Sequence, residues 1–452
     1  MKLFIRTKVS VAAMSLLLAG TLAAQEQTPN ASRHLTLDEA VRLALAHNHG
    51  VRITKFEVDE KQHEKDAAKS AYLPSLKNES SVVHVTDLEG VRIPAGALGT
   101  VDGTDVPSHN LTLLQGGQTF ETSGTSLSEP LTSLLKVKSK NDIAEAELKA
   151  VQSEARQTQN EVALKVRQIY YGILVAQLHL AALKAGVTAS QDQAQERAQQ
   201  VKFGAALDQA LIETKAQSLE SKQQLLTTEL QLSDLTSQMN DVIGLPLDTQ
   251  LSLDPTTPQI QEPCRIEECK QLAIQSHPDV KAAEQKVAAA SAGVRLAKRD
   301  YIPDTEIFAR YSYQNNVPFL VHNFGTFGFL FTYDIFDGGK KRATLDAQKS
   351  QLDEANENLA RVKDEVELAV QIAYNKLQRT HEMVTVSEQL LALREESYRE
   401  ANQQLQQGTI LQSQASQATA QELDARAGLL QSQLDYLQAQ DELEVATGQV
   451  PE

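Results

Sequence analysis

The sequence lacks tryptophan, has few other aromatic residues and, beyond its N-terminus, has no long apolar run. Phe, Tyr and Trp make up 5% of the 452 residues, and the mean hydropathy is −0.33. This composition argues against a single compact globule with a large aromatic core. After residue 24 we find no stretch of about 18 apolar residues, so the sequence predicts no transmembrane helix.

Basic residues are also in deficit. The 43 Lys and Arg residues are outnumbered by 59 Asp and Glu residues, which gives a formal net charge of −16. Such an acidic chain is a poor match for a phosphate backbone, and we expect no nucleic-acid partner. The His residues are scattered, and His47 and His49 have no Cys or carboxylate neighbours at metal-ligand spacing. We expect both to be surface residues, and we expect no catalytic site, metal or cofactor.

Residues 1–24 have the pattern of a secretory signal peptide. A basic start precedes an apolar run over residues 9–18, and small residues then allow cleavage after Ala24. A retained membrane anchor is the alternative. The leader implies export to an oxidising compartment.

The chain contains two cysteines, Cys264 and Cys269. In an oxidising compartment they are close enough in sequence to form a local disulfide. The alternative is that Cys269 is a small buried residue on a helix face, since Ala40 occupies the aligned position in the repeat described next. The sequence slightly favours this alternative.

The chain contains an internal repeat. Residues 37–74 align without a gap on residues 266–303, and residues 161–244 align without a gap on residues 365–448. The first copy is longer between its two blocks, where residues 88–110 are rich in Gly, Pro and Asp and predict a long exposed loop. Each copy therefore predicts the order helix, strand, loop, strand and two long helices.

The first helix of each copy has recognisable ends. Thr36 is the expected N-cap, with Glu39 three residues later in a capping box. The helix is expected to end before Pro74, and its counterpart before Pro303, because the residue before a proline disfavours helical geometry.

The long helices have coiled-coil spacing. A helix predicted from about Ser139 to Val201 carries apolar residues at alternating intervals of four and three, namely Val162, Val166, Ile169, Ile173, Ala176, Leu180, Leu183 and Val187. Such a seam packs one stripe of the helix against a partner helix. Taken alone, the seam is equally compatible with a purely structural coiled coil.

The aromatic residues are concentrated in one region. Seven of the eleven Phe and four of the ten Tyr lie within residues 301–336. Apolar residues alternate in residues 323–336, with Leu330 as the exception, and place on one strand face Phe327, Phe329, Phe331, Tyr333 and Ile335. Residues 305–313 alternate as well, which predicts a hairpin with one aromatic face.

This aromatic hairpin needs an apolar covering that the chain does not supply. The first copy offers only the strand at residues 76–85 and a weak strand around residues 111–127, and both are too polar to cover an aromatic sheet. Lipid would cover it. Strands in a bilayer close into barrels, which begin at about eight strands, so a chain with four strands has to oligomerise. Three copies would supply twelve.

These features together resemble the TolC-like outer membrane efflux proteins. The resemblance covers nearly the whole mature chain and rests on LTLDEAVRLALAHN with its AYLPSL close, YDIFDGGKKRATLDAQ, and VKFGAALDQALIETKAQ followed by VIGLP. It implies a mainly α protein with membrane β-strands, built from two tandem repeats. In the homotrimer a twelve-stranded outer-membrane β-barrel continues into a periplasmic α-helical coiled-coil barrel.

The resemblance also implies a function without catalysis. The protein would be the outer-membrane exit duct of a tripartite efflux or type I secretion system, with a periplasmic adaptor at its tip and an inner-membrane pump behind it. The alternative is a periplasmic coiled-coil adaptor or scaffold, and a periplasmic enzyme is a third, weaker reading. The adaptor reading leaves the aromatic hairpin unexplained.

The expected organisation has three parts. After the leader at 1–24, the first repeat spans 25–254, with strands within about 75–127 and a helical hairpin at about 139–244. The second repeat spans 255–452, with strands within about 304–336 and a hairpin at about 340–448.

Two groups of functional residues follow from the resemblance. The adaptor would contact the hairpin tips at Phe203, Gly204, Leu207, Asp208, Gln407, Gly408, Thr409 and Leu411. Some relatives narrow the closed tip with Asp rings six and nine residues after the second turn glycine, where this sequence has Gln414 and Gln417. We therefore expect an uncharged pore constriction there, with Glu213 of the first copy as a further candidate. The aromatic residues Phe327, Phe329, Phe331 and Tyr333 would face lipid.

Overall fold

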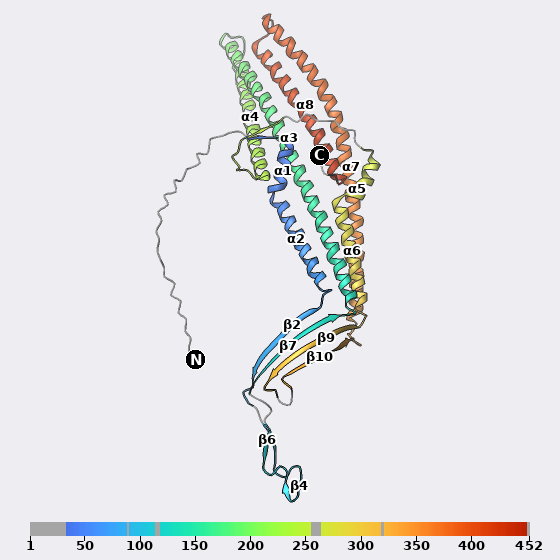
Figure 1. The fold of residues 1–452 in the computed structure, drawn as a ribbon. Coiled ribbons are helices and arrows are strands. Elements are labelled where there is room, and N and C mark those ends of the chain that lie inside the picture. Colours follow the sequence, from blue (N-terminus) through green and yellow to red (C-terminus); the bar gives the residue numbers. More distant parts are fainter. Residues whose placement is uncertain (1–32, 88–89, 114–117, 255–263, 318–320, 450–452) are drawn as a thin grey trace, which may run out of the picture.

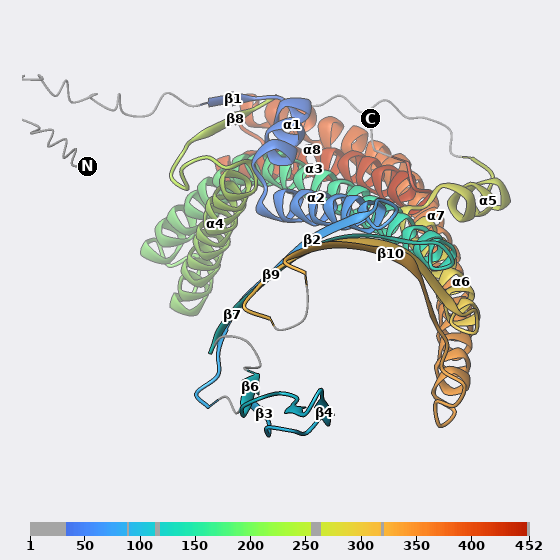
Figure 2. The same ribbon diagram turned by 60° about the horizontal axis from the view of Figure 1, so that its bottom comes forward.

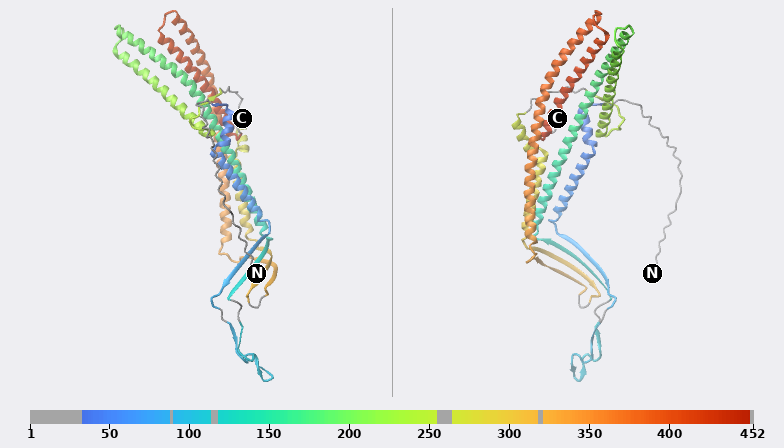
Figure 3. Two further views of the ribbon diagram at one scale, coloured as in Figure 1. Left: turned by 60° about the vertical axis from the view of Figure 1, so that its left-hand side comes forward. Right: turned by 180° about the vertical axis from the view of Figure 1, so that it is seen from behind.

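The computed structural model describes residues 33–87, 90–113, 118–254, 264–317 and 321–449, and the leader expected at residues 1–24 lies outside this part. The molecule is elongated and mostly helical, as expected, with a four-stranded sheet at one end (Figure 1). Two long helical hairpins lie side by side and turn at the end farthest from the sheet (Figure 3).

The same order of elements occurs twice along the chain. The first half contains α1 (Leu37–His47), α2 (His49–Ser70), β2 (Ser75–His84), β7 (Thr119–Pro130), α3 (Leu134–Lys202) and α4 (Asp208–Ile243). The second half contains α5 (Ile266–Ser276), α6 (Pro278–Arg299), β9 (Asp304–Asn315), β10 (Asn323–Thr332), α7 (Lys340–Gln406) and α8 (Gln412–Ala446). Two short strands, β1 (Arg33–Leu35) and β8 (Leu251–Leu253), pair in parallel beside the first half.

The single helix expected at the start of each copy is in fact two helices. The helix is interrupted at Asn48 in the first copy and at His277 in the second, where the backbone is extended. Asn48 has a φ of −60° and a ψ of 129°, and His277 has a φ of −59° and a ψ of 130°. Each residue caps the next helix with its side chain: Asn48 Oδ1 accepts from the Gly50 N–H at 2.8 Å, and His277 Nδ1 accepts from the Asp279 N–H at 3.2 Å. Internal capping residues, which the sequence analysis did not consider, explain the breaks.

The outer limits of these helices agree with the prediction. Thr36 Oγ1 accepts from the Glu39 N–H at 3.3 Å, as an N-cap does. Helices α2 and α6 end at Ser70 and Arg299, before the two prolines.

The first part of the predicted seam of α3 lies in the first hydrophobic core. Val166, Ile169 and Ile173 are buried there, next to the fully buried Tyr170. The Tyr170 hydroxyl donates to the backbone carbonyls of Leu35 at 3.1 Å and Asp254 at 2.9 Å, and so ties α3 to the β1–β8 pair.

Helix α3 meets the length and composition criteria for a membrane span, although the sequence predicts no transmembrane helix. Among the described helices, α3 alone is long and apolar enough to cross a bilayer, with a mean hydropathy of 1.4 over 18 residues. Helices in the core of a protein meet the same criteria of length and composition. Helix α3 packs against α1, α2, α4, α6 and α8. Its packing role accounts for its apolar character.

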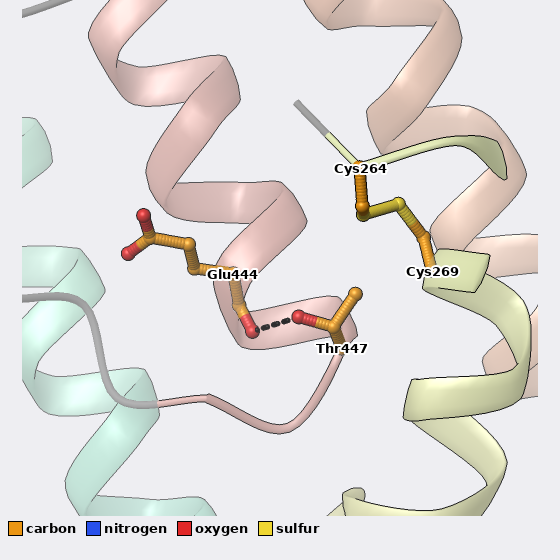
Figure 4. Close-up of a disulfide and its surroundings, with 4 residues drawn as sticks. All are labelled: Cys264, Cys269, Glu444 and Thr447. Carbon is orange, nitrogen blue, oxygen red and sulfur yellow. Dashed lines mark hydrogen bonds between the residues drawn. A yellow bond between two sulfur atoms is a disulfide. The ribbon is translucent and has the colours of Figure 1, made fainter. Parts of the chain in front are cut away.

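The second hydrophobic core surrounds the disulfide. Cys269 on α5 is fully buried and bonded to Cys264, close to the end of α8 where the Thr447 hydroxyl donates to the Glu444 carbonyl at 2.9 Å (Figure 4). The sequence analysis slightly favoured an unpaired Cys269, which is wrong about the bond but correct about the burial. Ala40, aligned with Cys269, is fully buried too.

The sheet has the strand order β10-β9-β7-β2 and is antiparallel throughout. Its central pair, β7 and β9, joins the two halves of the chain, and β2 and β10 are the edges. Figure 2 shows that the sheet is curved into an arc.

The strand limits differ from the prediction at two places. Residues 111–127 do not form one strand, because β6 (Leu111–Leu113) pairs with β3 (Val91–Ile93) and β7 begins at Thr119. The expected exposed loop therefore contains short strand pairs, including β4 (Thr100–Val101) with β5 (Thr104–Asp105), and extends beyond the sheet (Figure 1).

A buried ion pair joins α3 to α8 and hence the two halves of the helical region. Arg167 Nη1 lies 3.1 Å from Asp441 Oδ1, and both residues are buried. Burial raises the pKa of Asp441 to about 6, although the Arg167 charge opposes the rise. Burial likewise raises the pKa of the neighbouring Tyr171 to about 12.

This raised pKa predicts a pH-dependent stability. Because the folded pKa of Asp441 exceeds its ordinary value of 3.8, ionisation lowers the free energy of unfolding, and the loss develops between about pH 4 and pH 6. Asp441→Asn removes this titration. From pH 4 to pH 7, the free energy of unfolding of the native protein should fall by up to about 3 kcal/mol relative to that of the variant. Denaturant unfolding in detergent measures this difference. A difference that is constant with pH would contradict the assignment.

Candidate functional site

The four-stranded sheet has one face with a strong aromatic character. The strand register places Phe327, Ala309, Leu127 and Leu76 in one row across all four strands. Phe327 is 87% exposed, and Phe329 and Phe331 on the same face are 72% and 66% exposed. No described part of the chain covers these rings, as a lipid-facing surface requires.

Tyr333, also expected on this face, lies just beyond the end of β10. Its ring lies 5.0 Å from Lys341 Nζ at the start of α7, a cation–π contact at the junction between sheet and helix. Asp337 organises this junction, because its carboxylate accepts from the N–H groups of Lys341 and Gly339 at 2.8 and 2.9 Å.

The opposite face of the sheet is mostly polar and carries charges. Lys77 on β2, Arg310 on β9 and Thr326 on β10 share one row of this face, which Phe308 and Phe324 interrupt elsewhere. The curved sheet is therefore amphipathic, with one aromatic face and one mostly polar face.

The β2–β7 half of the aromatic face is polar, in agreement with the polar character that the sequence shows for these two strands. Asn78 Nδ2 donates to Thr125 Oγ1 at 2.9 Å, the Ser80 hydroxyl donates to Asn78 Oδ1 at 2.8 Å, and the Ser80 and Ser123 hydroxyls are 2.9 Å apart. These side chains satisfy one another, which lowers the cost of placing them in an apolar medium.

The two hairpins turn in the same way at the end of the molecule farthest from the sheet (Figure 1). Gly204 and Gly408 adopt φ of +71° and +70°, a left-handed conformation that favours glycine. Their N–H groups donate to the carbonyls of Val201 at 3.0 Å and Leu405 at 2.9 Å. The prediction of turn glycines here is confirmed.

All the residues expected to contact an adaptor are exposed at these turns. Phe203 and Leu207 are 81% and 77% exposed, and Leu411 is 50% exposed. Asp208, Gln407 and Thr409 are exposed as well. Large apolar side chains left bare at a helix turn are typical of a docking surface.

The residues expected at the constriction are exposed near the tips. Gln414 and Gln417 lie on the exposed side of α8, and Glu213 is exposed on α4, in the other hairpin. Gln414 has a further role, because its Oε1 accepts from the Leu411 N–H at 3.1 Å and so caps α8.

Two carboxylates near the tips hold the hairpins together and were missed by the sequence analysis. Glu196 on α3 accepts from the Ser413 N–H at 2.9 Å and from its hydroxyl at 2.5 Å, and Asp192 accepts from the Ser416 hydroxyl at 2.7 Å. A carboxylate at the start of a helix is favourable. No local sequence pattern reveals a cap supplied by a residue more than two hundred positions away.

His47 and His49 are exposed, as predicted. In the described part of the chain, no group of three His, Cys, Asp or Glu residues is arranged to hold a metal ion.

The chain thus combines an amphipathic curved sheet with two long helical hairpins, and this architecture can be compared with those of known proteins. The family model described as outer membrane efflux protein matches residues 270–449, from α5 to the end of α8. No curated protein sequence matches the chain.

Solved structures match over almost the whole chain. A membrane protein from Pseudomonas aeruginosa matches with a TM-score of 0.73 and 17% identity, covering 91% of this chain and 90% of that chain. The CmeC outer membrane channel of Campylobacter jejuni matches with a TM-score of 0.73 and 15% identity, covering 91% of this chain and 85% of that chain. The outer membrane protein VceC from Vibrio cholerae matches with a TM-score of 0.71 and 16% identity, covering 92% of this chain and 97% of that chain.

These matches confirm the resemblance to the TolC-like outer membrane efflux proteins. The solved structures establish the fold, and the family match identifies the chain as similar to outer membrane efflux proteins. The similarity is therefore one of fold over almost the whole chain and of family over residues 270–449.

The orientation of the sheet predicts a position-specific effect of charge. Phe329→Lys and Phe331→Lys put a charge on the aromatic face, which costs about 2–4 kcal/mol near the middle of a bilayer. We expect both variants to lose most of their assembled, membrane-inserted protein, as measured by outer-membrane fractionation.

Thr332→Lys is the matched control. Thr332 follows Phe331 in β10 and belongs to the opposite face. It should insert normally, and equal insertion of all three variants would show that the aromatic face does not contact lipid.

Proposed function

We propose that this protein is the exit duct of a tripartite efflux or type I secretion system, which passes substrates across the outer membrane without chemical change. The observation that carries the proposal is that one chain joins the amphipathic sheet directly to the long helical hairpins (Figure 1). A periplasmic scaffold would have no use for a sheet with bare aromatic rings.

The sheet supports a closed homo-oligomer. Because the four strands alternate in direction, edge strand β10 of one copy and edge strand β2 of the next run antiparallel. Identical copies can therefore continue the ladder until it closes, which a bilayer requires. Three copies make a twelve-stranded barrel, within the size range of outer-membrane barrels.

The helices support the same arrangement. Figure 2 shows α4 and α7 at opposite edges of the helical layer. Both edges carry exposed apolar stripes, with Ile212, Leu219, Leu226 and Leu230 on α4 and Leu368, Ile372, Met383, Val386, Leu390 and Leu393 on α7. We infer that α4 of one copy packs antiparallel on α7 of its neighbour and closes a coiled-coil barrel.

The proposal includes the two-repeat organisation and the partners. The second repeat would be the counterpart of the first, so that three copies give a tunnel of six similar units. The exposed tips around Phe203, Leu207 and Leu411 would bind a periplasmic adaptor, and the adaptor would connect the duct to an inner-membrane pump.

The helical seam can be tested by oligomeric state. The double variant Leu390→Glu with Leu393→Glu places charges in the proposed contact between copies, where each buried leucine contributes about 1.5–3 kcal/mol. We expect it to run as a monomer in detergent, by light scattering or native mass spectrometry, while the native protein is a trimer.

Gln389→Glu is the matched control for this experiment. Gln389 is exposed on the same turn of α7 but outside the apolar stripe. It should remain trimeric. A trimer in all three proteins would exclude the seam, and a native monomer would exclude the closed duct.

The constriction predicts a cation effect. The double variant Gln414→Asp with Gln417→Asp should make conductance in planar bilayers more sensitive to divalent cations, because repeated carboxylates concentrate them in a narrow pore. Gln412→Asp, exposed on the same turn of α8, is the control. Equal block of both variants would remove Gln414 and Gln417 from the pore lining and make Glu213 the next residue to test.

A further inference from the structure

The polar face of the sheet contains an unusual arrangement of Arg310 and Gly124. Arg310 lies near the middle of β9, and its guanidinium lies flat against Gly124 on the neighbouring strand β7. A Cβ on Gly124 would lie 2.6 Å from Arg310 Nε and 2.8 Å from Cζ, and closer still to Nη2. Even an alanine would therefore displace the guanidinium.

Steric room, rather than backbone conformation, explains this glycine. Gly124 is absent from the glycines of the described chain that have positive φ. Its ladder partners are Glu79 on β2 and Ser312 on β9, in regular antiparallel register. The glycine lets Arg310 lie across β7 toward β2.

The Arg310 charge is not neutralised by a contact partner. Its side chain makes no ion pair and no hydrogen bond with any residue in the described part of the chain. The carboxylate on which it acts electrostatically, Glu79, is already 2.6 Å from Lys77 Nζ. The three neighbouring residues Lys77, Glu79 and Arg310 on this face therefore comprise two basic groups and one carboxylate.

Such a charge requires water. An unpaired guanidinium in the middle of a membrane strand is too costly in lipid, and ionisable groups within membrane segments characteristically line aqueous pathways. Arg310 is exposed and lies on the face opposite Phe327, which places it toward the lumen of the proposed barrel.

We propose that Arg310, held flat by Gly124, forms a belt of guanidinium groups in the exit pore that attracts anionic groups of the cargo. Carboxylates and phosphates are the chemical groups it fits, because the planar fork of arginine pairs with both. This inference rests on the proposed duct and names a determinant of its selectivity. The face interior to the barrel, rather than the periplasmic tip, supplies this determinant.

The test is ion selectivity of the full-length channel in planar bilayers. With a KCl gradient, Arg310→Gln should lower the chloride-to-potassium permeability ratio by about two-fold or more, because removing a charge belt changes the pore potential by a sizeable fraction of kT or more. Arg310→Lys should keep most of the native ratio. Gly124→Leu displaces the guanidinium of Arg310 but leaves its positive charge in the pore. This variant should change the conductance.

Arg342→Gln is the matched control. Arg342 is at the start of α7, outside the sheet, and its side chain is 87% exposed. It should leave the ratio unchanged. If Arg310→Gln conducts with the native ratio, the selectivity belt is wrong while the duct stands. If the native protein does not conduct at all, the duct itself is wrong.

Discussion

The whole architecture depends on one constraint: the backbone groups at the two edges of the sheet have no hydrogen-bond partner strand within one chain. A bilayer contains no water to satisfy backbone N–H and C=O groups, so β2 and β10 cannot remain open there. Four alternating strands cannot close on themselves, but identical copies can extend the ladder. This requirement accounts for the need of several copies, which would together enclose the charged face of the sheet.

The helical region applies the same principle to side chains. Each chain buries two cores of its own, around Tyr170 and around the Cys264–Cys269 disulfide. It leaves apolar stripes on α4 and α7 at opposite edges. Contacts inside the chain, such as Arg167 with Asp441 and Glu196 with Ser413, fix the two hairpins relative to each other. Neighbouring copies would then cover the remaining apolar surface.

The sequence predicted those features that have a local signal. Alternation identified the aromatic face of β10, and glycines located both hairpin turns. The sequence analysis missed the helix interruptions at Asn48 and His277. The helical periodicity of the sequence continues across both residues, although their backbone is extended.

Features made by residues far apart in sequence were beyond such reasoning. The cap that Glu196 supplies to α8 and the contact of Arg310 with Gly124 depend on which segments become neighbours in space. The preference for an unpaired Cys269 failed for the opposite reason: comparison with Ala40 indicated burial correctly but carried no information about Cys264.

A structure of the native protein in lipid nanodiscs, at a resolution that separates β-strands, tests the central claim most directly. The account predicts a closed barrel of three copies in which β2 of each chain pairs with β10 of its neighbour, with Phe327, Phe329 and Phe331 against lipid. A sheet whose β2 and β10 edges stay open, or a barrel with the aromatic face turned inward, would contradict it.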